Sequence, residues 1–197
     1  MNEMTIGRLL RSSTTGYVFG CSVPEPEVPQ FGMFVKAPAQ RGQTETIGLI
    51  YNIAIEDDPF VRQMVATPDL PEAYIQDQRL NRQVPIEVSV LAVGYRNGDR
   101  FVQALPPQPP ITLDRISSCS DAEVCLFTER LDYVRLILNA ADAPADELIT
   151  AAVQRAAACR SPEERPRFLR EAGKELARLL SRDLPRLENL LRRIRPS

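Results

Sequence analysis

The chain has 197 residues, of which 44% are hydrophobic and 25% are charged, and its net charge is −2. These ordinary globular values exclude global disorder and a uniformly basic chain. Histidine is absent, which excludes catalytic pairs that need an imidazole and histidine-ligated zinc sites. No GxxxxGK[ST] motif occurs, and no GxGxxG follows a strand, so no phosphate-binding loop is expected. We therefore expect no cofactor and no enzymatic activity.

The location of the protein is predicted from three absences in the sequence. No stretch approaches the roughly 20 apolar residues that a membrane span needs. The segment Met1–Thr5 lacks a basic region followed by an apolar signal core. No two cysteines have CxxC spacing, which favours reduced structural thiols. We expect a cytoplasmic protein without a membrane partner, whose four thiols are Cys21, Cys119, Cys125 and Cys159.

The first half of the chain has the pattern of short β-strands. Strands are expected at residues 4–10, 16–20, 31–37, 46–53, 84–95 and 100–105. Asn97-Gly98 predicts a hairpin turn before the last of them, because both residues tolerate positive φ. Between the fourth and fifth strands, Asp58-Pro59 favours a short helix. Short strands with closely spaced turns indicate a small closed barrel.

A proline run, Pro106-Pro107-Gln108-Pro109-Pro110, is the clearest boundary in the sequence. Such a run favours extended polyproline geometry, which acts as a semi-rigid spacer. The prediction is an α+β protein with a barrel domain at 1–105, a proline-rich linker at 106–117 and a separate helical bundle at 118–197.

Four helices are expected after the linker. The first begins at Ser120, whose spacing to Glu123 predicts a capping box. Others begin at Pro144, at Ser161-Pro162 and at Pro185. The first helix should supply most of the surface against which later leucines pack. Its predicted core stripe consists of Val124, Phe127, Leu131, Val134 and Leu138.

The β half resembles the HAS-barrel family, which forms the N-terminal barrel of HerA-type ATPases and of rotary ATP synthase subunits. Four blocks carry the resemblance in the same order: Ile6–Phe19, Phe31–Val35, Ile47–Ile53 and Leu91–Gly98. The chain departs from the large family members because a proline run and helices stand where their ATPase domain would follow. The resemblance implies a standalone barrel with an assembly role, without nucleotide hydrolysis.

The leading functional hypothesis is a non-catalytic binding or assembly adaptor. Its barrel would dock a protein partner, and the resemblance implies a ring ATPase, such as a HerA-like enzyme, or a NurA-type nuclease. The oligomeric state stays open. A contiguous apolar stripe on the last helix would be a candidate partner site if it were exposed. That stripe consists of Leu187, Leu190, Leu191 and Ile194.

The alternative hypothesis is a DNA-repair accessory protein that contacts nucleic acid through its tail. From Ser161 to the end, ten basic and six acidic residues give a local charge of +4. The interleaved glutamates are also typical of a solvated helix. The arginines that would contact phosphates are Arg182, Arg186, Arg192, Arg193 and Arg195.

Two polar clusters have a structural explanation as well as a functional one. Glu56-Asp57-Asp58 could hold a divalent cation, but it lacks the spaced ligands of a calcium loop and favours a helix cap. Ser12-Ser13-Thr14-Thr15 has no base that would activate a hydroxyl, which favours a polar turn.

Overall fold

A computed structural model describes residues 5–21, 29–55, 71 and 86–195. Two of the expected features, the short helix at Asp58 and the acidic cluster at 56–58, lie outside these residues. A 3₁₀ turn, η1 (Gln40–Gly42), joins the third and fourth strands. The strands are β1 (Thr5–Ser12), β2 (Gly16–Cys21), β3 (Phe34–Ala39), β4 (Thr44–Ile55), β5 (Ile86–Asn97), β6 (Arg100–Val102) and β7 (Arg115–Ser118).

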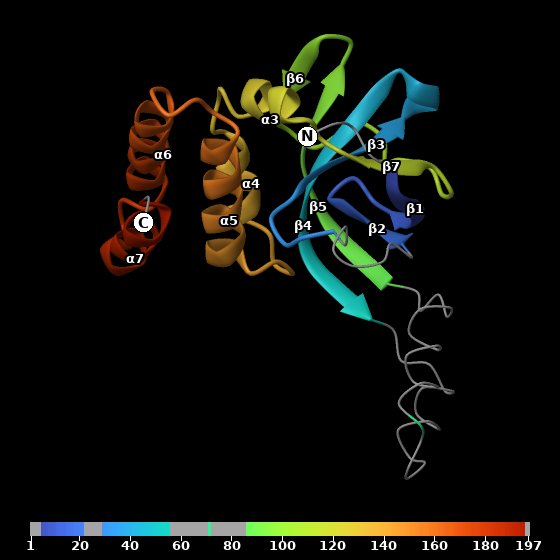
Figure 1. Ribbon diagram of the computed structural model, residues 1–197, viewed down its shortest axis with the longest axis horizontal. Helices are drawn as coiled ribbons and strands as arrows, with labels where there is room; N and C mark the ends of the chain where they lie inside the picture. The colour runs from blue at the N-terminus through green and yellow to red at the C-terminus, as the bar shows by residue number, and fades with distance from the viewer. Residues whose placement is uncertain (1–4, 22–28, 56–70, 72–85, 196–197) are drawn as a thin grey trace.

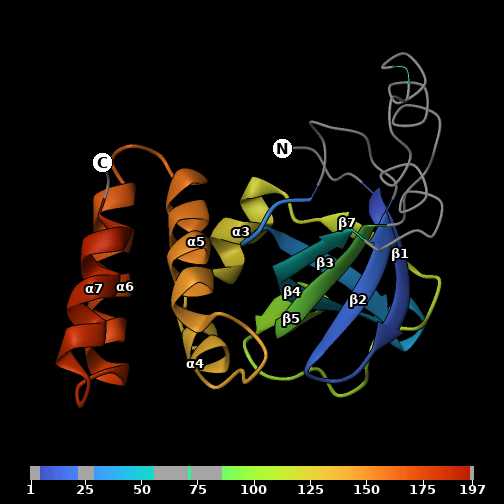
Figure 2. The same ribbon diagram turned by 90° about the horizontal axis from the view of Figure 1, so that it is seen from below.

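Six of the strands form a closed barrel in which all neighbours are antiparallel. Their order is β2-β1-β7-β3-β4-β5, and β2 pairs with β5 to close the ring. Figures 1 and 2 show the strands wrapping around a common interior. The short strand β6 lies outside the ring as a hairpin on β5. The sequence prediction of a small barrel in an α+β protein is confirmed.

The sequence predicts a barrel that ends before the proline run, but the barrel in the structure continues beyond that run. The strand β7 follows that run and pairs with both β1 and β3, so it fills the position that closes the barrel. The prolines belong to a loop that runs along β1, where Ser12 Oγ donates to the carbonyl of Pro110 at 2.7 Å. Pro106 and Pro110 are buried. The barrel therefore extends to Ser118, and the segment 106–114 is one of its loops.

Alternation along the strands sends one set of apolar side chains into the barrel. Leu9, Phe19 and Val35 have no measurable exposure, and they contact the inward side chains of the neighbouring strands. Gly48 lies where two strands approach closely, because a Cβ there would be 2.3 Å from Val90 Cγ1. Glycine is the residue that permits such an approach. The interior is thus filled by side chains.

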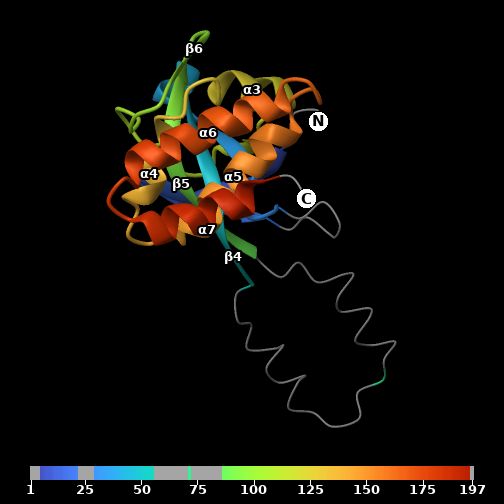
Figure 3. The same ribbon diagram turned by 90° about the vertical axis from the view of Figure 1, so that its left-hand side faces the viewer.

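Five helices follow the barrel in the described residues, and none of them is long and apolar enough to span a membrane. Figure 1 shows α4 and α5 beside the barrel and α6 and α7 as an outer layer. Figure 3, which faces the outer layer, shows α6 and α7 side by side. The helices are α3 (Asp121–Phe127), α4 (Tyr133–Leu138), α5 (Ala145–Ala158), α6 (Arg165–Leu179) and α7 (Leu184–Ile194).

The helices share one hydrophobic core with the outer face of the barrel. Phe34, Leu49 and Val93 point out of the barrel and belong to the same buried cluster as the helical side chains. Gly32, at φ +78°, brings the chain against α5, where an added Cβ would lie 2.4 Å from the Cβ of Ala151. The helical region is therefore packed on the barrel and is not the separate unit that the sequence analysis expected.

The first predicted helix is broken into α3 and α4. The capping box of Ser120 and Glu123 is present as predicted. The break comes from Gln103, which follows β6 in the chain. Its amide donates to the carbonyls of Phe127 and Arg130, and its side-chain oxygen accepts from the backbone N–H of Tyr133. Because this long-range side chain satisfies the groups that a continuous helix would pair, the helix ends and restarts.

The β5–β6 turn lies one residue later than predicted. Asn97 still pairs with Arg100, and Gly98-Asp99 form the two-residue loop. Gly98 has φ +57°, whereas Asn97 keeps an ordinary negative φ.

The carboxylate of Glu123 fastens α3 to the barrel. Lys36, a buried residue of β3, donates to it at 2.6 Å, and Arg96 of β5 donates at 3.3 Å. The backbone N–H and the hydroxyl of Ser120 donate to the other oxygen at 2.8 and 3.0 Å. Burial opposes the charged form, but the hydrogen bonds from Lys36 and Ser120 outweigh it and hold the pKa of Glu123 below its ordinary value. This stabilisation is present above the unfolded-state pKa and is lost as the pH falls through the folded-state pKa.

We expect Glu123→Ala to lower the free energy of unfolding by about 3–5 kcal/mol, because it removes a carboxylate that accepts from the buried Lys36 ammonium and that completes the capping box of α3. The double variant Lys36→Met/Glu123→Gln removes both charges and keeps a side chain that can complete the capping box. Its free energy of unfolding should fall by less than half as much as that of Glu123→Ala. Urea denaturation at neutral pH measures both losses. Equal losses in the two variants would show that the buried charge does not cause the destabilisation.

Candidate functional site

The apolar residues of the last helix lie in the core. Leu190 and Ile194 are buried, and Leu187 and Leu191 are partly buried against the same cluster. They pack on α5 and α6. The expectation that the first predicted helix supplies most of the opposing surface is therefore wrong. The reason is that α5 lies at the centre of the helical layers and buries residues such as Leu148, Ile149 and Val153 on several sides. The four candidate residues therefore do not form an exposed stripe in the single chain.

The arginines of the tail are divided between ion pairs and solvent. Arg186 pairs with Asp146 of α5 at 2.7 Å, and Arg193 pairs with Glu147. A hydrogen bond from each guanidinium to its carboxylate raises the pKa of both arginines. Two of the five candidate arginines are thus already engaged within the chain.

The other three candidate arginines, Arg182, Arg192 and Arg195, are exposed. Arg192 donates to the side-chain oxygen of Asn189 at 3.2 Å. Among the described residues, none of the three has a carboxylate partner within ion-pair distance.

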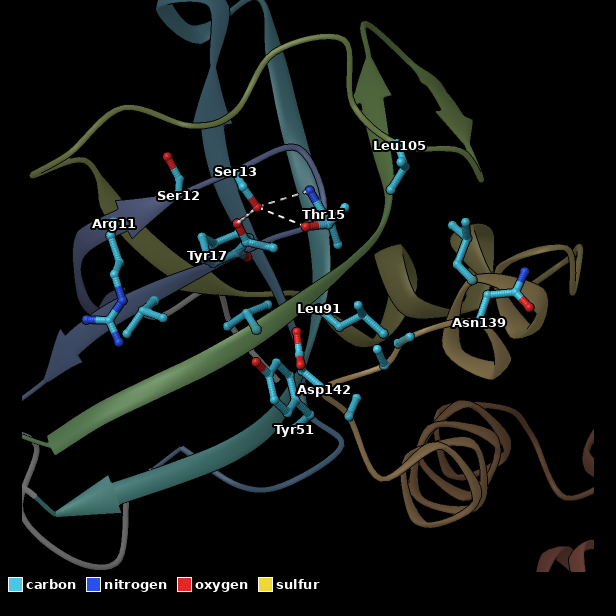
Figure 4. Close-up of a pocket in the computed structure, with 18 residues that line it drawn as sticks. Arg11, Ser12, Ser13, Thr15, Tyr17, Tyr51, Leu91, Leu105, Asn139 and Asp142 are labelled. Atoms are coloured by element: carbon cyan, nitrogen blue, oxygen red, sulfur yellow. Dashed lines mark hydrogen bonds between the residues drawn. The ribbon is translucent and has the colours of Figure 1, made fainter.

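A groove of about 580 Å³ lies between the barrel and the α4–α5 loop. Figure 4 shows Tyr51 and Asp142 beside Leu91, with Leu105 farther along the lining. At the barrel end, Ser13 is engaged with Thr15 and with the carbonyl of Gly16, which stabilises the β1–β2 turn. The predicted polar turn is therefore present. Its Ser13 and Thr15 hydroxyls satisfy local hydrogen bonds, and no described side chain is arranged as a base beside them.

A second groove, of about 450 Å³, lies between β6 and α3. Phe101 and Phe127 form its inner wall, with ring centroids 5.7 Å apart. Leu126, an exposed residue of α3, lies at its rim beside the ion pair of Arg130 and Asp132. Besides the two rings, charged residues such as Asp99, Glu129 and Arg130 line this groove.

Two of the four thiols, Cys119 and Cys159, have the properties of structural cysteines. Burial raises the pKa of Cys119, and burial also raises the pKa of Cys159 to about 11. Both thiols are therefore protonated at neutral pH and are weak nucleophiles. In the described part of the chain, no three cysteine or acidic side chains gather closely enough to hold a metal ion.

The side of the barrel formed by β1 exposes apolar side chains that the sequence analysis did not select. Leu10 projects from β1, while Ile111 and Leu113 belong to the loop that runs beside it. The loop is fixed to the strand because the N–H of Leu113 donates to the carbonyl of Leu9 at 2.8 Å, and the N–H of Leu9 donates to Asp114 at 2.9 Å. We call Leu10, Ile111 and Leu113 the β1 patch. The adjacent Leu9-Leu10 pair was its only sequence signal, since one of two neighbouring strand residues must point outward.

Leu113 has an unusual backbone conformation. Its φ is +71°, in the left-handed region, and its side chain is 70% exposed. It occupies the third position of a turn in which the N–H of Asp114 donates to the carbonyl of Ile111 at 3.3 Å. Arg8 also donates to the carbonyl of Leu113 at 3.0 Å. Glycine or asparagine is the usual residue in such a position.

Comparison of the sequence with known protein families finds no matching family model, and comparison with curated proteins finds no significant match.

We expect Leu190→Ala to lower the free energy of unfolding by about 2–5 kcal/mol, because it opens a cavity between α5 and α7. The matched control is Leu184→Ala, since Leu184 begins the same helix but is 67% exposed. The control should change stability by no more than about 0.5 kcal/mol. Urea denaturation of both variants tests the assignment, and similar losses would contradict it.

Proposed function

We propose that the chain is a non-catalytic assembly adaptor whose barrel docks a protein partner through the β1 patch. The observation that carries the proposal is Leu113, a large apolar side chain held in solvent by a left-handed backbone. A left-handed leucine costs roughly 1–2 kcal/mol, and its exposed side chain recovers little of that cost by burial in its own chain. Strain of this kind is retained where a surface has a function.

Leu113 is accompanied by two other exposed apolar residues on the same side of the barrel, Leu10 and Ile111. Seven large hydrophobic residues are exposed in the described part of the chain, and three of them form the β1 patch. An exposed group of apolar side chains on a folded domain is typical of a protein-binding site. Figure 2 shows β1 on the side of the barrel that faces away from α5, α6 and α7, so the helices leave this side open.

The resemblance of the first strands to the HAS-barrel family supports the kind of partner. In that family the barrel has an assembly role beside ring ATPases. A ring ATPase or a nuclease is accordingly the partner that we propose. Nucleic-acid binding through the tail takes second place, because Arg186 and Arg193 are occupied by ion pairs with α5.

The test is the variant Leu113→Gly, which removes the side chain and relieves the backbone. We expect the free energy of unfolding to rise by up to about 1 kcal/mol, since glycine adopts positive φ without a Cβ clash. We expect capture of the partner to fall at least about tenfold, because a leucine that is buried on docking is lost. Thermal denaturation measures the first effect. Quantitative mass spectrometry of proteins that co-purify from the native cell measures the second.

The matched control is Leu184→Gly, which removes a leucine of nearly equal exposure from α7. It should leave capture unchanged. If Leu113→Gly retains the same co-purifying proteins at the wild-type level, the β1 patch is not the docking surface and the proposal fails.

A further inference from the structure

We infer that the β1 patch docks an acidic segment of the partner in which carboxylates alternate with apolar side chains. This inference rests on the proposed function and adds the chemistry of the partner. It is carried by a separate observation, the charges that surround the three apolar residues.

Two arginines lie directly opposite each other at this surface. The β1–β7 register pairs Arg8 with Arg115, and both residues are exposed. Side chains of directly opposite residues project from the same face, with Cβ atoms about 5 Å apart. Like charges in this position are destabilising. A sequence selected only for folding would place a carboxylate or a neutral residue at one of the two positions.

Neither guanidinium is neutralised within the described residues. Arg8 uses one N–H for the carbonyl of Leu113, which leaves most of its five donors available. Arg115 has no carboxylate within ion-pair distance in that part of the chain, and the adjacent Asp114 does not pair with it. Arg11 lies three residues after Arg8 on β1. It differs from Arg8 because Glu87 of β5 pairs with it at 3.0 Å. The uncompensated charge is therefore concentrated at Arg8 and Arg115.

The same loop connects the charges with the apolar residues. Leu113 accepts from Arg8 through its carbonyl, and Arg115 follows it by two residues. Leu10 lies two residues beyond Arg8 on β1. Leu10 and Leu113 lie two residues along the chain from Arg8 and Arg115 respectively, so a docked segment that contacts the two leucines lies next to the arginine pair. Carboxylates complement two adjacent guanidinium groups, because the planar donors of arginine bind them in a bidentate manner.

The composition of the surface favours protein over nucleic acid. Single-stranded nucleic acid is bound by aromatic side chains on which bases stack, whereas the β1 patch contains only aliphatic ones. Duplex binding relies on many phosphate contacts, and this surface offers only two arginines without a carboxylate partner in the described part of the chain. A membrane surface would require a larger group of cations around the apolar residues.

The experiment selects ligands from a phage-displayed library of random peptides on the full-length protein, with counter-selection on Arg8→Gln/Arg115→Gln. We expect the recovered peptides to be enriched in aspartate, glutamate and large apolar residues relative to the input library. The selected peptide is then titrated by fluorescence polarisation. Arg115→Gln should weaken its affinity about tenfold, whereas Arg182→Gln, which removes an exposed arginine of the α6–α7 connection, should leave it unchanged.

A stability measurement accompanies the binding assay. Because Arg115→Gln removes a like-charge contact and breaks no ion pair of the described residues, we expect its melting temperature to equal or exceed that of the wild type. Weaker peptide binding with undiminished stability would assign Arg115 to the site rather than to the fold. Recovered peptides without acidic enrichment, or an affinity that is insensitive to Arg115→Gln, would overturn the inference.

Two further probes distinguish other ligands. A single-stranded oligonucleotide and vesicles of phosphatidylcholine with phosphatidylserine are each titrated against the wild type and Arg8→Gln/Arg115→Gln. The inference would also be overturned if either probe bound through Arg8 and Arg115 while no selected peptide depended on those two residues. The proposed function fails separately, when Leu113→Gly does not reduce partner capture. Loss of capture in that variant with normal capture in Arg115→Gln would retain the adaptor and reject the acidic segment.

Discussion

The carboxylate of Glu123 joins the start of the helical region to the barrel. It caps α3 through Ser120 and receives the buried ammonium of Lys36 from β3. The ion pair with Lys36 and the hydrogen bonds from Ser120 meet at one carboxylate, so α3 begins where the barrel presents Lys36. Because β7 ends at Ser118, two residues before the cap, the barrel closes immediately before the helices start. The position of α3 in turn directs α4 and α5 onto β4 and β5.

This attachment divides the barrel into a covered side and an open side. The outward side chains of β3, β4 and β5, such as Phe34 and Leu49, are buried beneath the helices. The outward side chains of β1 face away from them (Figure 2). An apolar residue on the covered side is explained by packing, but Leu10 on the open side is not. If the proposed function holds, this side is where the partner would reach the barrel.

Local signals in the sequence predicted much of this fold, and long-range contacts explain the differences. The capping box of Ser120 and Glu123 needs only four residues, and it is present as expected. The strand β7 was missed because it has four residues, follows a proline run and exists only through pairing with β1 and β3. The break between α3 and α4 depends on Gln103, which lies more than twenty residues earlier in the chain. The β1 patch required the φ of Leu113 and the register of β1, which no local pattern encodes.

The open side also shows how a functional surface can be recognised when no related protein indicates it. Most of the chain obeys local rules consistently, as foldable sequences do. A left-handed exposed leucine and a directly opposed pair of arginines occur together on one face, whereas Gln40 and Arg41, the other left-handed residues besides glycine in the described chain, belong to the η1 turn. The leucine and the arginine pair each cost stability within the single chain, and the hydrogen bonds that hold Leu113 to Leu9 and Arg8 neither bury the leucine side chain nor neutralise the two arginines. A bound segment with apolar and acidic side chains would offset both costs at once, because it would bury Leu113 and neutralise Arg8 and Arg115. The coincidence of the two violations is thus better explained by one ligand than by two unrelated imperfections of the fold.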